Sequence, residues 1–527
     1  MGAAAPDAGS TVPRGTRLRP ALLWSYVVST GLSAITALTT FVLAALLGPE
    51  EFGLLWMAMV WVNLGQVLLQ HGPTMAVIQQ DDITDRHLDA AFWTTLLGTA
   101  GFSALLAAAA PLWAAVNGLP RLTPLCLALT AILPLYALNA IPEAVLRRRM
   151  ELRGIALRYL VSGLVSGAAA IAAALAGLGV WALVVQQVGM TATNTVLLWT
   201  MTSWRPRLRR FGRELRDIRG TSVKTLLGAL GTFAQTRVDV VVMGAYFGPV
   251  VVGLFRFALR VPELVLGLAG RGLHDVALPD LARHGVDRQL LAARLARLAG
   301  LGAVLAWPAL GVVAAAAAPF VGLIGAQWQP AVTPMRLLCL AVATIMLNSL
   351  FQPALQAAGR PGLPALMNWL HAACLVVALW AAARLAAGLG TAGQVVAVAS
   401  ALVTVYLVLG VVSGWLTFSR VLRTSPWPTL RATAGGLAAA VAAAAAGGAV
   451  AAVLDHRLAP LPVLCLTVAT AATAAGTVLL GVDRRARDLA ARLLRRRYSS
   501  STGPPSSQTL PDHTLPGAPG SKSLTGP

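Results

Sequence analysis

The chain has 527 residues, of which 57% are apolar and only 12% are charged, and its formal net charge is +21. About a quarter of the residues of an ordinary soluble protein are charged, so this composition excludes a soluble enzyme. Apolar runs of 18 residues or more recur between residues 21 and 482, and runs of that length are typical of transmembrane helices. We therefore predict an all-α integral membrane protein.

Apolar windows predict about fourteen transmembrane helices, most of them in two lobes of six helices each. The least regular of these helices, 251–270, contains three charged residues. In chain order we expect a cytoplasmic head (1–20), an N-lobe (21–202), a basic cytoplasmic linker (203–222), a C-lobe (223–420), two further helices (428–482), and a basic helix with a disordered cytoplasmic tail (483–527).

The basic residues are distributed asymmetrically about the predicted membrane. Of the 41 Lys and Arg residues, 34 fall in segments on one side, four fall on the other side and three lie within spans. An excess of Lys and Arg marks the cytoplasmic side, so both chain ends are predicted to be cytoplasmic. The same asymmetry explains the basic composition without a nucleic-acid partner. Tryptophans near span ends, such as Trp328 in the longest predicted outer loop, are expected to anchor the membrane interface.

Several features weigh against catalysis. The predicted outer loops are short and carry only Glu50, Glu51 and Asp455 as acids, whereas acid/base chemistry on sugars needs a pair of positioned carboxylates. The sequence lacks a phosphate-binding loop of the nucleotide-hydrolysing type. Its four cysteines are far apart and lack metal-ligand spacing. We predict a protein that is not an enzyme and has no cofactor or metal; a membrane-embedded glycosyltransferase or polymerase is the less favoured alternative.

An internal repeat at an offset of 200 residues is the strongest organisational signal. LLGPEEFGLLWMA at 46–58 matches YFGPVVVGLFRFA at 246–258. In both copies a predicted span ends at Gly-Pro, where proline cannot continue the helix, and a new span follows. Because six helices separate the copies, both insert in the same orientation. This predicts parallel repeats about an axis along the membrane normal, as in transporters that rock one lobe against the other.

Six segments together resemble one family. They are LGPEEFG at 47–53, GPTMAVIQQDDITDRHLDAAFW at 72–93, IPEAVLRRRMELRGIALRYL at 141–160, GLGVWALVVQQ at 177–187, SWRPRL at 203–208 and TRVDVVVMGAYFGPVVVGLFRFALRVPEL at 236–264. As a set they resemble the polysaccharide (O-antigen and exopolysaccharide repeat-unit) flippases of the multidrug/oligosaccharidyl-lipid/polysaccharide (MOP) exporter superfamily. The resemblance runs from about residue 20 to about residue 420, and the last two spans agree with the family only in number.

The resemblance implies two lobes that face each other across a central cavity. It implies translocation of undecaprenyl-pyrophosphate-linked oligosaccharides across the bacterial inner membrane for cell-surface polysaccharide synthesis, beside glycosyltransferases and a polymerase. A lipid II-type transporter and a multidrug transporter of the same superfamily are alternatives. Basic groups within the spans weigh against cationic drugs.

Charged residues within spans are the first site candidates, because they usually face a bundle interior or an aqueous cavity. Arg256, Arg260 and Glu263 follow a spacing that places them on one face of a helix. Two arginines four residues apart repel each other, so an anion between them would explain their presence, and arginine binds phosphate oxygens through two N–H groups. The alternative is a salt-bridge network with Glu263 and Asp239 that only locks helices together.

Three further charged residues are site candidates, and two of them need partners on other helices. Arg237 and Asp239 are two positions apart and therefore do not face one another. Asp239 is expected either to pair with Arg260 or to act as a protonatable coupling group. Glu143 is the corresponding acid of the N-lobe, and Arg147, one turn further on, is its expected ion-pair partner.

Neutral polar side chains indicate a wet interior. Asn63, Gln66 and Gln70 share a face of the second span, and Asn348 and Gln352 share a face of the tenth. Sugar hydroxyls need such neutral donors and acceptors, so we expect these amides to line a cavity. A Ser/Thr stripe on the first span, which ends in Thr36 and Thr40, is explained equally well by close helix packing.

Overall fold

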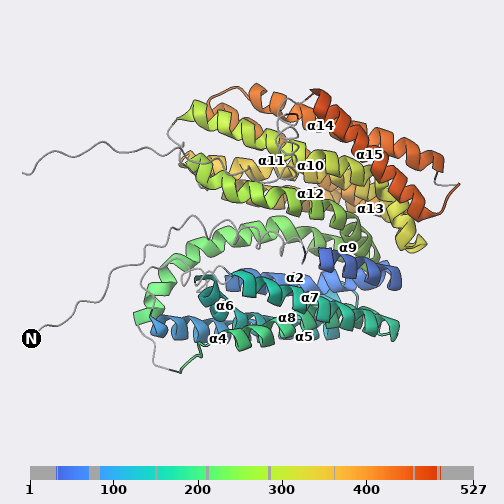
Figure 1. Cartoon of the computed structure of the whole chain (residues 1–527). Coiled ribbons are helices and arrows are strands. Elements are labelled where there is room, and N and C mark those ends of the chain that lie inside the picture. The colour runs from blue at the N-terminus through green and yellow to red at the C-terminus, as the bar shows by residue number, and fades with distance from the viewer. Residues whose placement is uncertain are drawn as a thin grey trace, which may run out of the picture.

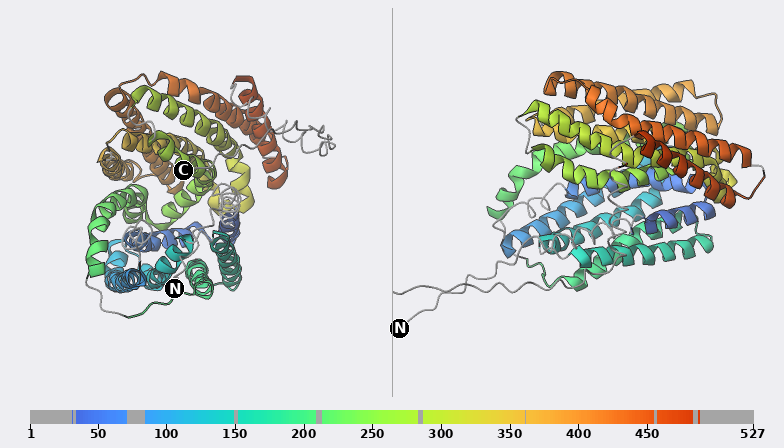
Figure 2. Two further views of the ribbon diagram at one scale, coloured as in Figure 1. Left: turned by 60° about the vertical axis from the view of Figure 1, so that its left-hand side comes forward. Right: turned by 45° about the horizontal axis from the view of Figure 1, so that its top comes forward.

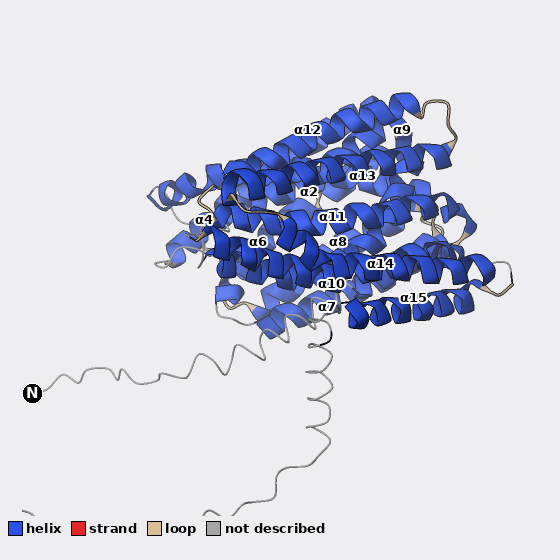
Figure 3. Ribbon diagram, turned by 90° about the horizontal axis from the view of Figure 1, so that it is seen from above, coloured by secondary structure: helices blue, strands red, loops and turns tan. Residues whose placement is uncertain are grey.

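The computed structural model describes residues 31, 34–70, 84–148, 152–208, 213–282, 287–360, 362–454, 457–482 and 487. Within these ranges the chain forms helices and short connections, without a strand (Figure 3). Ten helices in this described part are long and apolar enough to cross a membrane. The prediction of an all-α, multi-pass membrane protein is confirmed. The number fourteen stays a prediction, and the predicted head and tail lie outside the described residues, apart from residue 487.

The first half of the chain forms one group of helices. In chain order they are Ala34–Leu46, α2 (Pro49–Gln70), α4 (Asp85–Val116), α5 (Leu122–Thr130), α6 (Ile132–Arg148), α7 (Leu152–Leu175) and α8 (Val180–Met201). The predicted span 123–146 consists of α5 and α6, which are separated at Ala131. α7 packs along α8, and α4 packs against α5 and α6.

α9 (Arg213–Ala282) contains two predicted spans, 223–247 and 251–270, without a loop between them. The chain reverses at a kink at Gly248, whose φ of 78° lies in the left-handed region that glycine tolerates. Pro249 follows directly and has the fixed φ of a residue that starts a helix. The Gly-Pro signal of the repeat is thus a sharp turn between two helical segments, as the sequence predicts.

The second half of the chain continues with long helices. They are α10 (Arg288–Ile324), the short helix η1 (Ala326–Ala331), α11 (Val332–Ala357), α12 (Gly362–Leu385), α13 (Thr391–Trp415), the π-helical segment η2 (Leu416–Leu422), α14 (Trp427–Leu454) and α15 (Pro460–Val482). α14 packs mainly against α10, and α15 packs against α14 and α10. Glycine allows this close approach, because a Cβ on Gly311 would overlap the backbone of Ala440.

The two groups of helices lie side by side, with α9 along their boundary (Figures 1 and 2). α9 contacts α2 on one side and α11 and α12 on the other. The repeat residues meet at this boundary: a Cβ on Gly53 would overlap the carbonyl oxygen of Pro249, and a Cβ on Gly253 would overlap that of Pro49. Equivalent residues of the two repeats therefore contact each other reciprocally, which is the pattern of a two-fold axis.

Trp328 lies near this contact and is fully buried. Its Nε1 donates a hydrogen bond of 2.8 Å to the carbonyl oxygen of Ala44, and its ring lies 4.2 Å from that of Phe257, centroid to centroid. The prediction that Trp328 anchors the membrane interface is wrong. The indole has a backbone acceptor in the first group of helices and an aromatic neighbour on α9, so η1 helps to close the boundary between the two groups.

The start of the predicted linker packs on α4. The Asp89 carboxylate accepts a hydrogen bond of 3.1 Å from the backbone N–H of Arg207, and Trp93 donates one of 3.3 Å to the carbonyl oxygen of Arg207. The rings of Phe92 and Trp204 pack edge to face beside them. Two of the segments that carry the family resemblance are thereby joined to each other.

Candidate functional site

A cavity of about 270 Å³ lies between the two groups of helices. α2, α6 and α8 form one wall together with helix Ala34–Leu46, and α9 forms the other. Its lining residues are mostly polar or aromatic: Thr36, Thr40, Phe52, Leu55, Trp56, Met59, Asn63, Gln66, Tyr136, Leu183, Gln186, Gln187, Arg237, Arg256, Phe257 and Arg260. The Ser/Thr stripe of the first span thus contributes Thr36 and Thr40 to the cavity.

All three predicted in-span arginines line this cavity, and one of them has a carboxylate partner. Arg256 Nη2 lies 2.9 Å from Asp239 Oδ1, and both side chains are buried. Asp239 therefore pairs with Arg256, and its predicted pairing with Arg260 is wrong. The turn at Gly248 explains the choice: Asp239 precedes it by nine residues and Arg256 follows it by eight, so the two side chains lie at similar depth, whereas Arg260 lies one turn deeper.

The other charges leave the cavity with an excess of positive charge. Among the described residues, neither Arg237 nor Arg260 forms an ion pair, and Glu263 is exposed without one. The Nε atoms of Arg256 and Arg260 are buried and have no hydrogen-bond partner. Buried donors normally have an acceptor, so unpartnered ones indicate a missing ligand or water. Three guanidinium groups and one carboxylate form a site that favours an anion.

The ring of Trp56 on α2 contacts two of these arginines. The guanidinium carbon of Arg256 lies 5.2 Å from the centroid of the Trp56 ring, and that of Arg237 lies 5.8 Å from it. These distances are within the range of a cation–π interaction. Trp56 is not among the predicted site residues, although the repeat contains a signal: Trp56 stands where the second copy has Arg256.

Neutral polar groups face the arginines across the cavity. Asn63 and Gln66 on α2 line the cavity, as predicted. Gln186, Gln187 and Tyr136 also line it and were not predicted. The two glutamines end the segment GLGVWALVVQQ, which was used only for the family resemblance. Their polarity near the middle of an apolar helix is the signal that could have identified them. The side chain of Gln70 lies outside the described residues.

Asn348 and Gln352 do not reach this cavity. Both are on α11, and Gln352 Nε2 donates a hydrogen bond of 3.3 Å to Asn368 Oδ1 on α12. The amide nitrogen and oxygen of Asn348 are buried without partners. These amides therefore belong to a polar cluster inside the second group of helices, and a role in binding substrate stays a prediction.

Glu143 lies in a separate ion pair of the first group of helices. Its Oε2 accepts hydrogen bonds from Arg158 Nη2 at 2.9 Å and from the Tyr159 hydroxyl at 3.1 Å. Arg158 on α7 is thus an observed partner that was not predicted; the side chain of the predicted partner, Arg147, lies outside the described residues. Helix-to-helix packing places Arg158 opposite Glu143, a contact that spacing within one helix cannot reveal.

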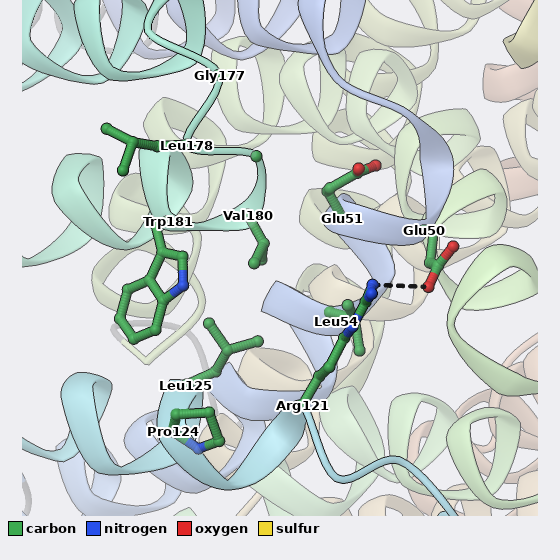
Figure 4. Close-up of a pocket in the computed structure, with 11 residues that line it drawn as sticks. Glu50, Glu51, Leu54, Arg121, Pro124, Leu125, Gly177, Leu178, Val180 and Trp181 are labelled. Atoms are coloured by element: carbon green, nitrogen blue, oxygen red, sulfur yellow. Dashed lines mark ion pairs between the residues drawn. The ribbon is translucent and has the colours of Figure 1, made fainter.

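A second pocket, of about 310 Å³, lies where α2 begins, beside α5 and the turn between α7 and α8 (Figure 4). Arg121 reaches toward Glu50 across it, with 3.9 Å between Nη1 and Oε1, and both side chains are largely exposed. Glu51 accepts a hydrogen bond of 3.0 Å from the backbone N–H of Gly48 and so holds the turn before α2.

Two groups of apolar helices, related by an internal repeat, enclose the cationic cavity. Solved structures of membrane transporters share this fold. The lipid II flippase MurJ in an inward closed conformation aligns with a TM-score of 0.66 and 12% identity, over 89% of this chain and 99% of that one. An inward-facing multidrug resistance MATE family transporter of the MOP superfamily aligns with a TM-score of 0.54 and 14% identity, over 76% and 96%.

The family is identified from the sequence. Residues 42–333, more than half of the chain, match the polysaccharide biosynthesis protein family, and the protein belongs to it. The succinoglycan biosynthesis transport protein ExoT of Rhizobium meliloti (strain 1021) is 25% identical over 339 residues, which cover 64% of this chain and 68% of that protein. The predicted resemblance to polysaccharide transporters of the MOP superfamily is confirmed.

Proposed function

We propose that the protein is a flippase that moves undecaprenyl-pyrophosphate-linked oligosaccharide repeat units from the inner to the outer leaflet of a bacterial inner membrane. The observation that carries this proposal is the cavity wall of Arg237, Arg256 and Arg260, with Asp239 as its one paired acid. A diphosphate is the part of such a lipid that carries concentrated negative charge. Arginine binds phosphate oxygens through two parallel N–H groups.

The opposite wall suits the saccharide. Asn63, Gln66, Gln186 and Gln187 offer amide donors and acceptors next to the arginines, and hydroxyl groups need both. A cationic drug would meet three guanidinium groups, so the multidrug alternative conflicts with the charge of the cavity. Membership in a polysaccharide biosynthesis family and the similarity to a protein described as a succinoglycan transport protein support the same substrate class.

Transport requires the cavity to open to each side in turn, without a chemical reaction on the substrate. The reciprocal contact of Gly53 and Gly253 joins the two groups of helices at one end of α2 and of the second segment of α9. The excess of basic residues on one side of the predicted membrane supports a location of this end at the outer side, with both termini in the cytoplasm. Rocking of the two groups then alternates access. Glycosyltransferases would supply the lipid-linked substrate, and a polymerase would consume it.

The test is translocation in liposomes that contain the purified protein and a fluorescent, diphosphate-linked lipid oligosaccharide, with a membrane-impermeant lectin as the outside probe. We expect the lectin-accessible fraction to rise without added nucleotide, and we expect Arg384→Ala, an exposed change on α12, to leave the rate unchanged. If no gradient produces translocation, the proposal is wrong. Uptake of a cationic dye instead would identify a multidrug transporter.

A further inference from the structure

Trp56 and Arg256 occupy the same position in the two copies of the internal repeat. Each stands three residues after the glycine of its copy, Gly53 or Gly253, at which the two backbones touch. Because the copies are related by an approximate two-fold axis, equivalent positions next to the axis face each other. One copy places an indole there and the other a guanidinium, 5.2 Å from the ring centroid.

The same ring also contacts Arg237, at 5.8 Å. Two guanidinium groups near one ring repel each other, and in a partly desolvated cavity this repulsion is stronger than in water. Asp239 compensates Arg256, whereas Arg237 forms no ion pair among the residues that the structure describes. The electron-rich faces of tryptophan attract cations, so Trp56 opposes the separation of the two arginines.

We propose that Trp56 is a positioning residue that makes Arg237 and Arg256 bind as one unit, and that it thereby sets a preference for diphosphate-linked over monophosphate-linked lipids. This inference rests on the proposed function, in which the cavity binds an anionic lipid. A monophosphate can satisfy one arginine through two N–H groups. A diphosphate has a second phosphate, whose binding requires the second arginine to be held within reach.

The contact also joins the two groups of helices. Trp56 is on α2, in the first group, and both arginines are on α9, which packs against the second group. The indole therefore lies beside the arginines only while α2 and α9 are together at the Gly53–Gly253 contact. When the helices separate there, the arginines lose the ring and hold a diphosphate less well. Release would then be favoured on the side that opens.

The experiment compares two probes that differ in one phosphate: farnesyl diphosphate and farnesyl monophosphate. Their Kd values are measured by calorimetry on the full-length protein in lipid nanodiscs. Trp56→Leu removes the ring and keeps an apolar side chain, and Trp56→Phe keeps an aromatic face. Trp380→Leu is the matched control, because Trp380 holds Arg384 at 5.5 Å in the same kind of contact on an exposed part of α12.

We expect Trp56→Leu to weaken diphosphate binding about tenfold, as loss of a partly buried cation–π contact predicts, and to change monophosphate binding by less than about threefold. Trp56→Phe should recover most of the loss, and Trp380→Leu should change neither Kd. The temperature of thermal unfolding is measured for each variant to confirm that it is folded.

Three outcomes would overturn the inference. If Trp56→Leu weakens both probes equally, or neither, the ring only packs in the wall and does not set the preference. If the wild-type protein binds the two probes equally, the preference itself is absent. If the wild-type protein binds neither probe, the proposed anionic-lipid function fails, and the inference fails with it.

Discussion

Two buried arginine–carboxylate pairs, one in each group of helices, have the same N–O distance of 2.9 Å: Arg158–Glu143 and Arg256–Asp239. Both guanidinium groups are almost fully buried. They differ in their surroundings. Neither Arg158 nor Glu143 lines the cavity, whereas Arg256 lines it beside two further arginines. Both guanidinium groups have buried nitrogens without a hydrogen-bond partner, so this feature does not distinguish the two pairs.

The comparison shows that burial and good ion-pair geometry do not by themselves identify a binding site. A buried pair that is neutral overall does not attract a charged ligand. Its loss is costly because a single charge would remain in an apolar environment. The pair at the cavity is accompanied by two extra positive charges, and this surplus is what an anionic substrate would neutralise. Four substitutions test this contrast.

Arg158→Met should have the largest effect on stability. It removes the guanidinium group that lies 2.9 Å from the Glu143 carboxylate, which is only 15% exposed, and breaking a buried pair costs about 3–5 kcal/mol. Thermal unfolding in detergent should show a strongly lowered Tm, and the double variant Glu143→Gln/Arg158→Met should recover much of it. Translocation per folded molecule should stay near wild type. If it is lost in a folded variant, Glu143 is a coupling group instead.

Arg260→Ala should affect function more than stability. Arg260 forms no ion pair in the described part of the chain, and its Nε lacks a partner, so its removal leaves no carboxylate uncompensated. Loss of a hydrogen bond to a charged group is worth about 1.5–3 kcal/mol, or about ten- to hundredfold in affinity for a diphosphate lipid. Membrane insertion should be normal and export reduced, with Arg260→Lys intermediate. Normal export would contradict an arginine-based phosphate site.

Much of this organisation can be predicted from the sequence. Long apolar runs predict an all-α membrane fold, the repeat at 200 residues predicts two related groups of helices, and the spacing of Arg256 and Arg260 predicts a basic helix face. Each of these predictions depends on the spacing of residues along one helix or on the comparison of two segments of the sequence. Such patterns are local, and the helical period makes them reliable.

Partners across helices cannot be predicted in this way. Spacing within α6 suggested Arg147 for Glu143, whereas Arg158, which the packing of α7 places beside Glu143, could not be found from that spacing. Asn348 and Gln352 share a polar face as expected, and that face turns toward Asn368 rather than toward the cavity. Trp328 was expected at the interface because its segment lies between two spans, whereas η1 folds inward. In each case the rotation and depth of a neighbouring helix decided the contact.

Gly53→Ala should weaken the contact between the two groups of helices, at a smaller cost in free energy than Arg158→Met. The new Cβ would overlap the carbonyl oxygen of Pro249, and overpacking of this kind costs about 1–3 kcal/mol. A cysteine at Ala331, which is fully buried in η1, should then react faster with an impermeant maleimide in a background without native cysteines. Gly101→Ala is the control, because a Cβ there meets nothing within 4 Å. Equal labelling of both variants would show that the contact does not close the boundary.

Arg121→Ala should have the smallest effect on stability and on translocation. Arg121 belongs to an exposed ion pair, which can be compared with the two buried pairs. Arg121 and Glu50 are 80% and 52% exposed and 3.9 Å apart, and such surface pairs contribute roughly 0–1 kcal/mol because water and salt screen them. Tm and translocation should match wild type at low and high ionic strength. A clear loss of translocation with unchanged Tm would mean that the pocket in Figure 4 acts on the substrate, and that surplus charge is not the only mark of a site in this protein.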